Sequence, residues 1–182
     1  MRGAAVLAIL LASASAAQAA SWKVLPGSAL TFTGSQAGEK FTGHFGQFDA
    51  KISLDPDKLA EASIVVAVDV ASAATGDLQR DTALPAKDWF DAAAFPQARF
   101  ESHQVTRTAA GYEAVGGLTL RGVTKEIHLP FTLAIDGRKA EAKGHLDLNR
   151  DLFGVGQGQW TSDEWVALKV GVDFDLKAER TD

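Results

Sequence analysis

The sequence predicts an all-β protein folded as an antiparallel barrel of about eight strands, with a short helical insert at the barrel mouth. Nearly every segment after Ser21 alternates apolar and polar residues, which is the pattern of strands with one buried and one solvated face. Turn signals such as Ala110-Gly111 and Arg121-Gly122 separate neighbouring segments. Closure of such a sheet into a barrel buries its apolar face and removes exposed edges.

The alternating segments define the expected strands. Apolar residues occupy every second position from Ile127 to Ile135 and from Val166 to Leu176. The apolar parity shifts between Phe45 and Phe48, which predicts a bulge or a sharp bend there. The expected strands are residues 30–33, 41–54, 63–70, 98–106, 112–120, 126–135, 140–149 and 165–176.

Residues 77–96 lose this alternation. They carry Pro85, where a helix could begin, and a cluster of Trp89, Phe90 and Phe95. We therefore expect one or two short helices that cap the mouth of the barrel.

The first 19 residues are predicted to be a secretory signal peptide. Arg2 supplies a positive charge, residues 4–12 are apolar, and Ala17-Gln18-Ala19 is an A-x-A cleavage site. The apolar run is shorter than the roughly 20 residues that span a bilayer. We expect residues 20–182 to form one periplasmic barrel domain that is not transmembrane.

Composition narrows the function classes. The chain has 182 residues, a formal net charge of -5 and no cysteine. Scattered Lys and Arg in an acidic chain argue against a nucleic-acid partner, and the lack of cysteine excludes thiol chemistry. The chain contains no G-x-S-x-G, no H-E-x-x-H and no phosphate-binding glycine loop. Neither an enzyme nor a cofactor is predicted.

The Asp136-Gly137 pair is typical of a two-residue type I′ hairpin turn. Such a turn would place Leu133 opposite Ala140, Phe131 opposite Ala142 and Leu129 opposite Gly144. Large residues would then face small ones across the inside of the barrel. Two interpretations follow with equal weight: the small residues complement the large ones in a filled core, or they leave an apolar cavity for a ligand.

The same register predicts an outward pair of His128 and His145, with Glu126 opposite Asp147. Two imidazoles beside carboxylates are potential metal ligands. The preferred interpretation is two solvated side chains, because no third ligand is fixed, and no metal site is assigned.

Several stretches in order then resemble one known family. They are Trp22 to Phe32 at the start, Gly43-His44-Phe45-Gly46-Gln47-Phe48, Ser72 with Thr75-Gly76 and Arg80-Asp81, Asp88-Trp89-Phe90-Asp91, residues 117–125, and Asn149 to Gly154. Together they resemble the YceI-like family of exported, lipocalin-like barrels that bind polyisoprenoids. The sequence departs from the family pattern at Ala83, where His is common, and at Ala50, where Gly is common.

This resemblance favours the cavity over the filled core. It implies a barrel that sequesters an isoprenoid quinone or polyprenyl chain as an apolar lipid ligand, with transient contact to an envelope membrane protein. Fatty-acid or fatty-amide binding, a scaffold role in envelope stress or electron transfer, and lipid modification by an enzyme are alternatives. The expected cavity residues are Phe32, Phe45, Val66, Val68, Phe100, Ala114, Gly116, Leu129, Phe131, Leu133, Ala140, Ala142, Gly144 and Val170. The expected head-group residues at the mouth are Arg80, Asp81, Asn149 and Arg150.

Overall fold

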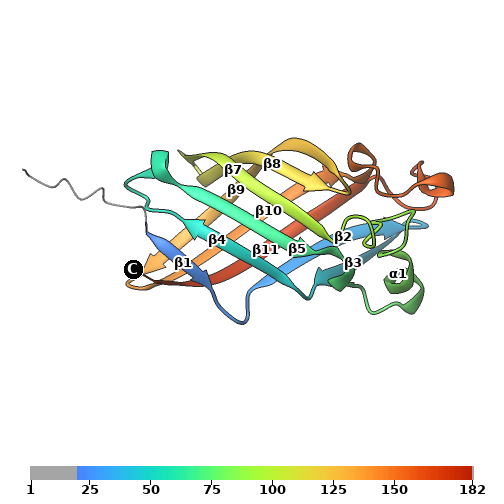
Figure 1. Cartoon of the computed structure of the whole chain (residues 1–182), viewed down its shortest axis with the longest axis horizontal. Coiled ribbons are helices and arrows are strands. Elements are labelled where there is room, and N and C mark those ends of the chain that lie inside the picture. The colour runs from blue at the N-terminus through green and yellow to red at the C-terminus, as the bar shows by residue number, and fades with distance from the viewer. Residues whose placement is uncertain (1–19, 182) are drawn as a thin grey trace, which may run out of the picture.

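A closed antiparallel barrel forms the body of the protein, as the sequence predicts (Figure 1). The structure, a computed structural model, describes residues 20–181; the predicted leader of residues 1–19 lies outside the described residues. The barrel strands, in order around the ring, are β1 (Ser21–Val24), β4 (Phe48–Ser53), β5 (Ser63–Asp69), β7 (Gln97–Thr108), β8 (Gly111–Leu120), β9 (Val123–Asp136), β10 (Lys139–Asn149) and β11 (Lys169–Arg180). Pairing of β11 with β1 closes the ring.

Two strand paths are interrupted halfway along the barrel. β1 and β2 (Ala29–Gln36) both pair with β11, through Val24 with Ala178 and Ala29 with Asp175. β3 (Glu39–Phe45) and β4 are separated by Gly46 and Gln47, at the bend expected from the parity shift. β6 (Ala73–Ala74) pairs with β3. The interruptions divide the barrel into a half that contains β1 and β4 and a half that contains β2 and β3.

The predicted position of the turn between β9 and β10 is wrong by one residue. Asp136 pairs with Lys139, so the two turn residues are Gly137 and Arg138. Gly137 has φ 59°, whereas Arg138 has no positive φ, and a positive φ at the first central position alone is the pattern of a type II′ turn. Gly137 thus serves one position earlier in the turn than expected.

This shift changes which residues of β9 and β10 lie opposite each other, but each side chain stays on the predicted face of the sheet. Ala140 pairs with Ile135, Ala142 with Leu133 and Gly144 with Phe131. The expected opposition of His128 and His145 is therefore wrong, because Gly144 lies opposite Phe131 and not opposite Leu129, which moves His145 out of line with His128. The predicted opposition of Glu126 and Asp147 fails for the same reason.

The insert contains one short helix, α1 (Leu78–Ala83). The Asp77 carboxylate caps it by accepting a hydrogen bond from the Arg80 N–H (3.0 Å). Pro85 follows this helix and does not begin one, while residues 84–95 form turns. Short 3-10 helices lie at Leu59–Glu61, Val70–Ser72, Arg150–Phe153 and Gly158–Trp160. Figure 1 places α1 at the end of the barrel opposite the C-terminus.

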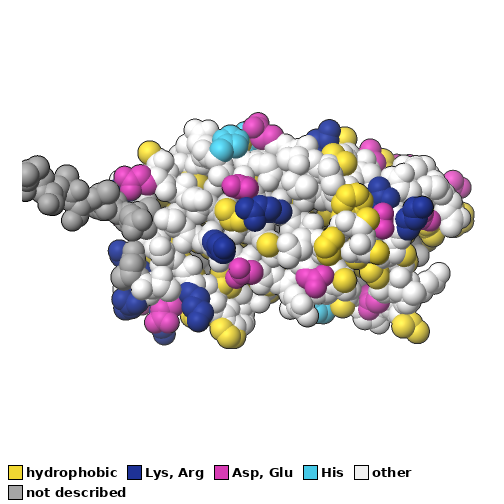
Figure 2. Space-filling view, viewed as in Figure 1, with side chains coloured by type: hydrophobic (Ala, Val, Ile, Leu, Met, Phe, Trp, Pro, Cys, Tyr) yellow, Lys and Arg dark blue, Asp and Glu magenta, His cyan; other side chains and the backbone are white. Residues whose placement is uncertain are grey.

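Two clusters of buried residues occupy the two ends. Trp22, Tyr112 and Phe131 belong to the cluster at the β1 end, and Phe32, Phe90 and Phe153 belong to the cluster at the α1 end. Charged side chains of both signs cover the outer wall (Figure 2). Within residues 20–181 no helix is long and apolar enough to cross a membrane.

Candidate ligand cavity

The barrel contains a cavity of about 270 Å³ that extends from the α1 end toward the β1 end. Leu54, Phe100 and Phe131 of the β1-end cluster line its floor, while Trp89, Phe153 and Val166 line it near α1. Its walls are apolar because every second residue of the strands points inward. Ser, Thr, His, Asp and Glu are all missing from the residues that line it.

Most of the positions expected to line a cavity do so. The members of the predicted set that line it are Phe32, Phe45, Val66, Val68, Phe100, Leu129, Phe131, Ala142 and Val170. Ligand binding by these residues stays a prediction.

The other five expected positions lie outside the lining. Ala114 is 0% exposed and packs in the β1-end cluster, which Leu133 and Ala140 also contact. A Cβ atom at Gly116 would lie 2.2 Å from the Glu101 carbonyl oxygen, so this glycine allows two backbones to approach at the irregular β7–β8 pairing. Gly144 is covered by an aromatic ring of the neighbouring strand. These residues pack against their neighbours and do not themselves face the cavity.

Three glycine–phenylalanine pairs lie across two strand pairs of the cavity wall, β2–β3 and β10–β11. Phe41 faces Gly34, Phe32 faces Gly43 and Phe174 faces Gly144, each as a direct cross-strand partner. A Cβ atom at any of these glycines would lie 2.3 to 2.6 Å from the facing ring. All three rings line the cavity. The glycines therefore let large rings lie against the wall, which keeps the lumen open.

Arg150 is a buried cation at the mouth, with 4% of its surface exposed. Its guanidinium donates to four backbone carbonyls, those of Val155 (2.9 Å), Ser162 (3.0 Å), Val166 (2.8 Å) and Ala167 (3.0 Å). Burial lowers the pKa of Arg150 from its ordinary value. Carbonyl dipoles thus replace water around this charge, and the guanidinium holds the loop that closes one side of the mouth.

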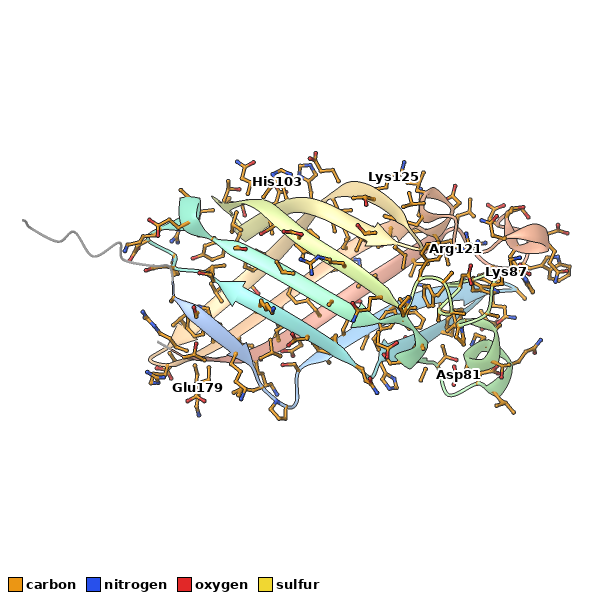
Figure 3. The ribbon with its side chains drawn as sticks, viewed as in Figure 1. Asp81, Lys87, His103, Arg121, Lys125 and Glu179 are labelled. Carbon is orange, nitrogen blue, oxygen red and sulfur yellow. The ribbon has the colours of Figure 1, made fainter. Side chains whose placement is uncertain are left out.

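The same loop is fastened to the insert. Gly156 and Gln157 donate backbone hydrogen bonds to the Asp88 carbonyl (2.9 and 2.7 Å). The Arg150 guanidinium lies 5.3 Å from the centre of the Trp89 ring. Arg121 donates to the Lys87 carbonyl (2.9 Å), and Figure 3 shows these two residues side by side at this end. The mouth is therefore built from two irregular segments held together by polar contacts.

The remaining predicted head-group residues differ in their surroundings. Asp81 accepts hydrogen bonds from the Thr75 hydroxyl and N–H (both 2.7 Å), and the hydroxyl bond is the main cause that lowers the Asp81 pKa. Arg80 donates to Gln36 Oε1 (3.2 Å) and lies 4.6 Å over the Phe41 ring. Asn149 is exposed at the end of β10. Arg80 and Arg150 thus reach pocket-lining positions, whereas Asp81 fastens the loop before α1.

Some lining residues escaped sequence reasoning. Phe41, Trp89, Phe90, Phe153 and Val166 line the cavity but were not named as lining residues. The aromatic cluster in the insert was a signal for two of them, and Val166 begins the apolar alternation of residues 166–176, whereas Phe153 follows no strand periodicity.

Three histidines on the outer wall lie beside carboxylates of neighbouring residues. His145 lies 2.8 Å from Asp173 and 3.4 Å from Asp147, and the hydrogen bond with Asp173 raises the His145 pKa. His128 lies 3.4 Å from Glu113. His103 contacts Glu126 (3.2 Å) on the outside of the barrel (Figure 3). Within the described chain, no group of three or more His, Cys, Asp or Glu is arranged to hold a metal ion.

The fold and the cavity define an antiparallel barrel protein with an enclosed apolar space. Residues 22–178 match the model of the YceI-like domain, and the chain belongs to the YceI-like family. A UPF0312 protein of Photorhabdus laumondii is 35% identical over 133 residues, which cover 71% of this chain and 69% of the relative. The resemblance expected from the sequence motifs is confirmed.

Two solved structures have the same fold. The BcnA protein of Burkholderia cenocepacia is 34% identical with a TM-score of 0.78, over 82% of this chain and 95% of that one. A polyisoprenoid binding domain from Saccharophagus degradans is 15% identical with a TM-score of 0.68, over 89% of this chain and 99% of that one.

Proposed function

We propose that the barrel binds the chain of an isoprenoid lipid, an isoprenoid quinone or a polyprenyl chain, and stores or carries it in the periplasm. The apolar cavity along the barrel axis is the observation that carries this proposal. Each buried methylene group contributes about 0.8 kcal/mol, so a long chain gains affinity without polar contacts. The Saccharophagus neighbour, described as a polyisoprenoid binding domain, supports the same ligand class. Delivery to an envelope membrane protein is part of the proposal.

The lining supports a binding protein and not an enzyme. A lipid-modifying enzyme needs a nucleophile or a general base within hydrogen-bond reach of its substrate. The two charged residues among those that line the cavity are Arg99 and Arg150. Arginine stays protonated in proteins, so neither is suited to act as a base.

Native mass spectrometry of protein purified from its own envelope, followed by organic extraction, tests the proposal. We expect the folded protein to carry one noncovalent ligand, and the extract to contain an isoprenoid. An extract that holds only a straight-chain fatty acid or amide, or no lipid at all, would overturn it.

A pair of glycine variants tests whether the ligand occupies the lumen. In Gly34→Ala the three atoms nearest the new Cβ all belong to the Phe41 ring, the nearest at 2.6 Å, so the ring must move and we expect it to tilt into the lumen. Gly117→Ala is the matched control, because its Cβ meets only Thr124 Cγ2 (3.2 Å) and Gly117 does not line the cavity. We expect less bound lipid in Gly34→Ala alone. Equal lipid content in both variants would contradict lumen binding.

A further inference from the structure

The main cavity offers a ligand almost no polar partner. The Arg99 guanidinium bonds Glu101 (3.2 Å) with 52% of its side chain exposed, so it points to the outer surface. The Arg150 guanidinium already donates to four backbone carbonyls. A polar head group buried among the remaining apolar side chains would lose its hydrogen bonds to water without replacement. The head group of a bound isoprenoid must therefore lie elsewhere.

A smaller pocket of about 80 Å³ adjoins the cavity at the α1 end. Phe41, Leu84, Trp89 and Val166 line both spaces, so the two lie side by side. The smaller pocket adds polar side chains, those of Gln36, Gln79 and Arg80, and the ring of Trp160. A chain in the cavity can thus place its head group among them.

Arg80, the cation that lines this pocket, is already paired with a carboxylate. Arg80 is the one cationic residue that lines the pocket, and its guanidinium lies 3.8 Å from the Asp77 carboxylate and donates to Thr75 Oγ1 (3.2 Å). The neighbouring Asp81 keeps its charge, because hydrogen bonds from Thr75 lower its pKa. A phosphate in the pocket would meet two carboxylates nearby and no unpaired cation, which disfavours it.

We propose that this pocket receives an uncharged, oxygen-bearing head group, a prenyl alcohol hydroxyl or a prenyl quinone carbonyl, and discriminates against prenyl phosphates. The amides of Gln36 and Gln79 both donate and accept hydrogen bonds. The rings of Trp89 and Trp160, with centroids 5.7 Å apart, provide apolar walls for a flat head group. The inference rests on the proposed binding of isoprenoids and specifies which of them the protein accepts.

Calorimetric titration of the delipidated full mature chain tests the inference. The probes are geranylgeraniol, a naphthoquinone with the same side chain, and geranylgeranyl phosphate. We expect the alcohol and the quinone to bind about tenfold more tightly than the phosphate. Equal or tighter binding of the phosphate would overturn the head-group assignment and leave the proposed function standing. Failure of all three to bind would overturn both.

Variants of the two glutamines locate the head group. Gln79→Leu alters an exposed side chain, and Gln36→Leu leaves Arg80 its contacts with Thr75 and Asp77. Each loss of a hydrogen bond should weaken binding of the alcohol and the quinone roughly fivefold. Phosphate binding should change little in Gln79→Leu, which leaves the bond from Arg80 to Gln36 in place. Gln104→Leu, at an exposed position of β7, is the matched control and should change nothing. Unchanged affinity in both pocket variants would refute the placement.

Discussion

The two ends of the barrel share strands and differ in how their interiors are filled. At the β1 end, Tyr112 stacks on Phe131 with centroids 5.5 Å apart, Ala114 is fully buried, and the Trp22 indole donates to the Leu54 carbonyl (2.8 Å). At the α1 end, rings such as Phe41 lie flat against glycines and leave space between them. Large-against-small pairing therefore fills one end and opens the other.

The difference between the two ends follows from the free volume around their side chains. At the β1 end, Ala114 is fully enclosed by larger side chains of the cluster, which leaves no free volume around it. At the α1 end, irregular segments around Arg150 and Trp89 close the barrel without filling it. We infer that stability is concentrated at the β1 end and binding space at the α1 end.

The largest expected effect belongs to Trp22→Ala. Removal of a buried indole from a filled cluster costs about 3–5 kcal/mol and leaves the Leu54 carbonyl without its donor. Denaturant unfolding of the delipidated protein measures the loss. A cost below about 1 kcal/mol would contradict the view that this end holds the fold together.

Arg150→Met should loosen the mouth and spare the β1 end. Four carbonyl oxygens lose a charged donor, and hydrogen bonds to charged groups are worth roughly 1.5–3 kcal/mol each before water replaces part of the loss, so we expect a local cost of about 3 kcal/mol. Hydrogen exchange should accelerate for residues 154–168 and remain slow in β8 and β9. Equal acceleration at both ends would show that the mouth is not a separate unit.

Two alanine-to-phenylalanine variants beside the β1-end cluster compare an enclosed position with one that lines the cavity. Ala114→Phe overpacks a filled cluster and should cost about 1–3 kcal/mol. Ala142→Phe places its ring in the cavity, so the delipidated protein should lose less than about 1 kcal/mol while bound lipid disappears. Thermal melts and lipid content check both, with delipidated protein as the reference because a ligand raises apparent stability. A strongly destabilised Ala142→Phe variant that keeps its lipid would contradict the distinction between a filled position and one that lines the cavity.

The smallest expected effect lies on the outer wall. Contact with Asp173 raises the folded-state pKa of His145 above its ordinary value of 6.5. The contact therefore stabilises the folded protein below pH 6.5, and this stabilisation is lost as the pH rises through the folded-state pKa. His145→Gln should lower stability by a few tenths of a kcal/mol at most near pH 5.5, because the pair is half-exposed and screened. Unfolding midpoints near pH 5.5 and near pH 8.5 measure it. A larger difference at the higher pH would contradict this sign.

Much of the fold could be predicted from the sequence, because the face of the sheet that a side chain occupies depends only on its position in its own strand. Alternation identified the inward residues of β9 and β11, and it placed the bend near Gly46. The register between β9 and β10 could not be predicted from the sequence. Gly137 can take the first or the second central position of the turn, and both arrangements keep every side chain on the same face of the sheet. β11 also begins at Lys169 and not at residue 165. The segment before it forms only an isolated bridge to the end of β2, between Val166 and Gln36, and its carbonyls accept hydrogen bonds from the Arg150 guanidinium.

Period-two alternation and motif order suffice to identify the class of fold, the inward face of each strand and the family, because neither depends on the three-dimensional structure. The sequence could not separate Ala114 from Ala142, which are both small, inward and flanked by large residues. Both lie at the β1-end cluster, and their tertiary neighbours decide that Ala114 is enclosed whereas Ala142 also lines the cavity. The partners of Arg150 were likewise decided by tertiary structure, since four carbonyls of an irregular loop leave no periodic signal in the chain.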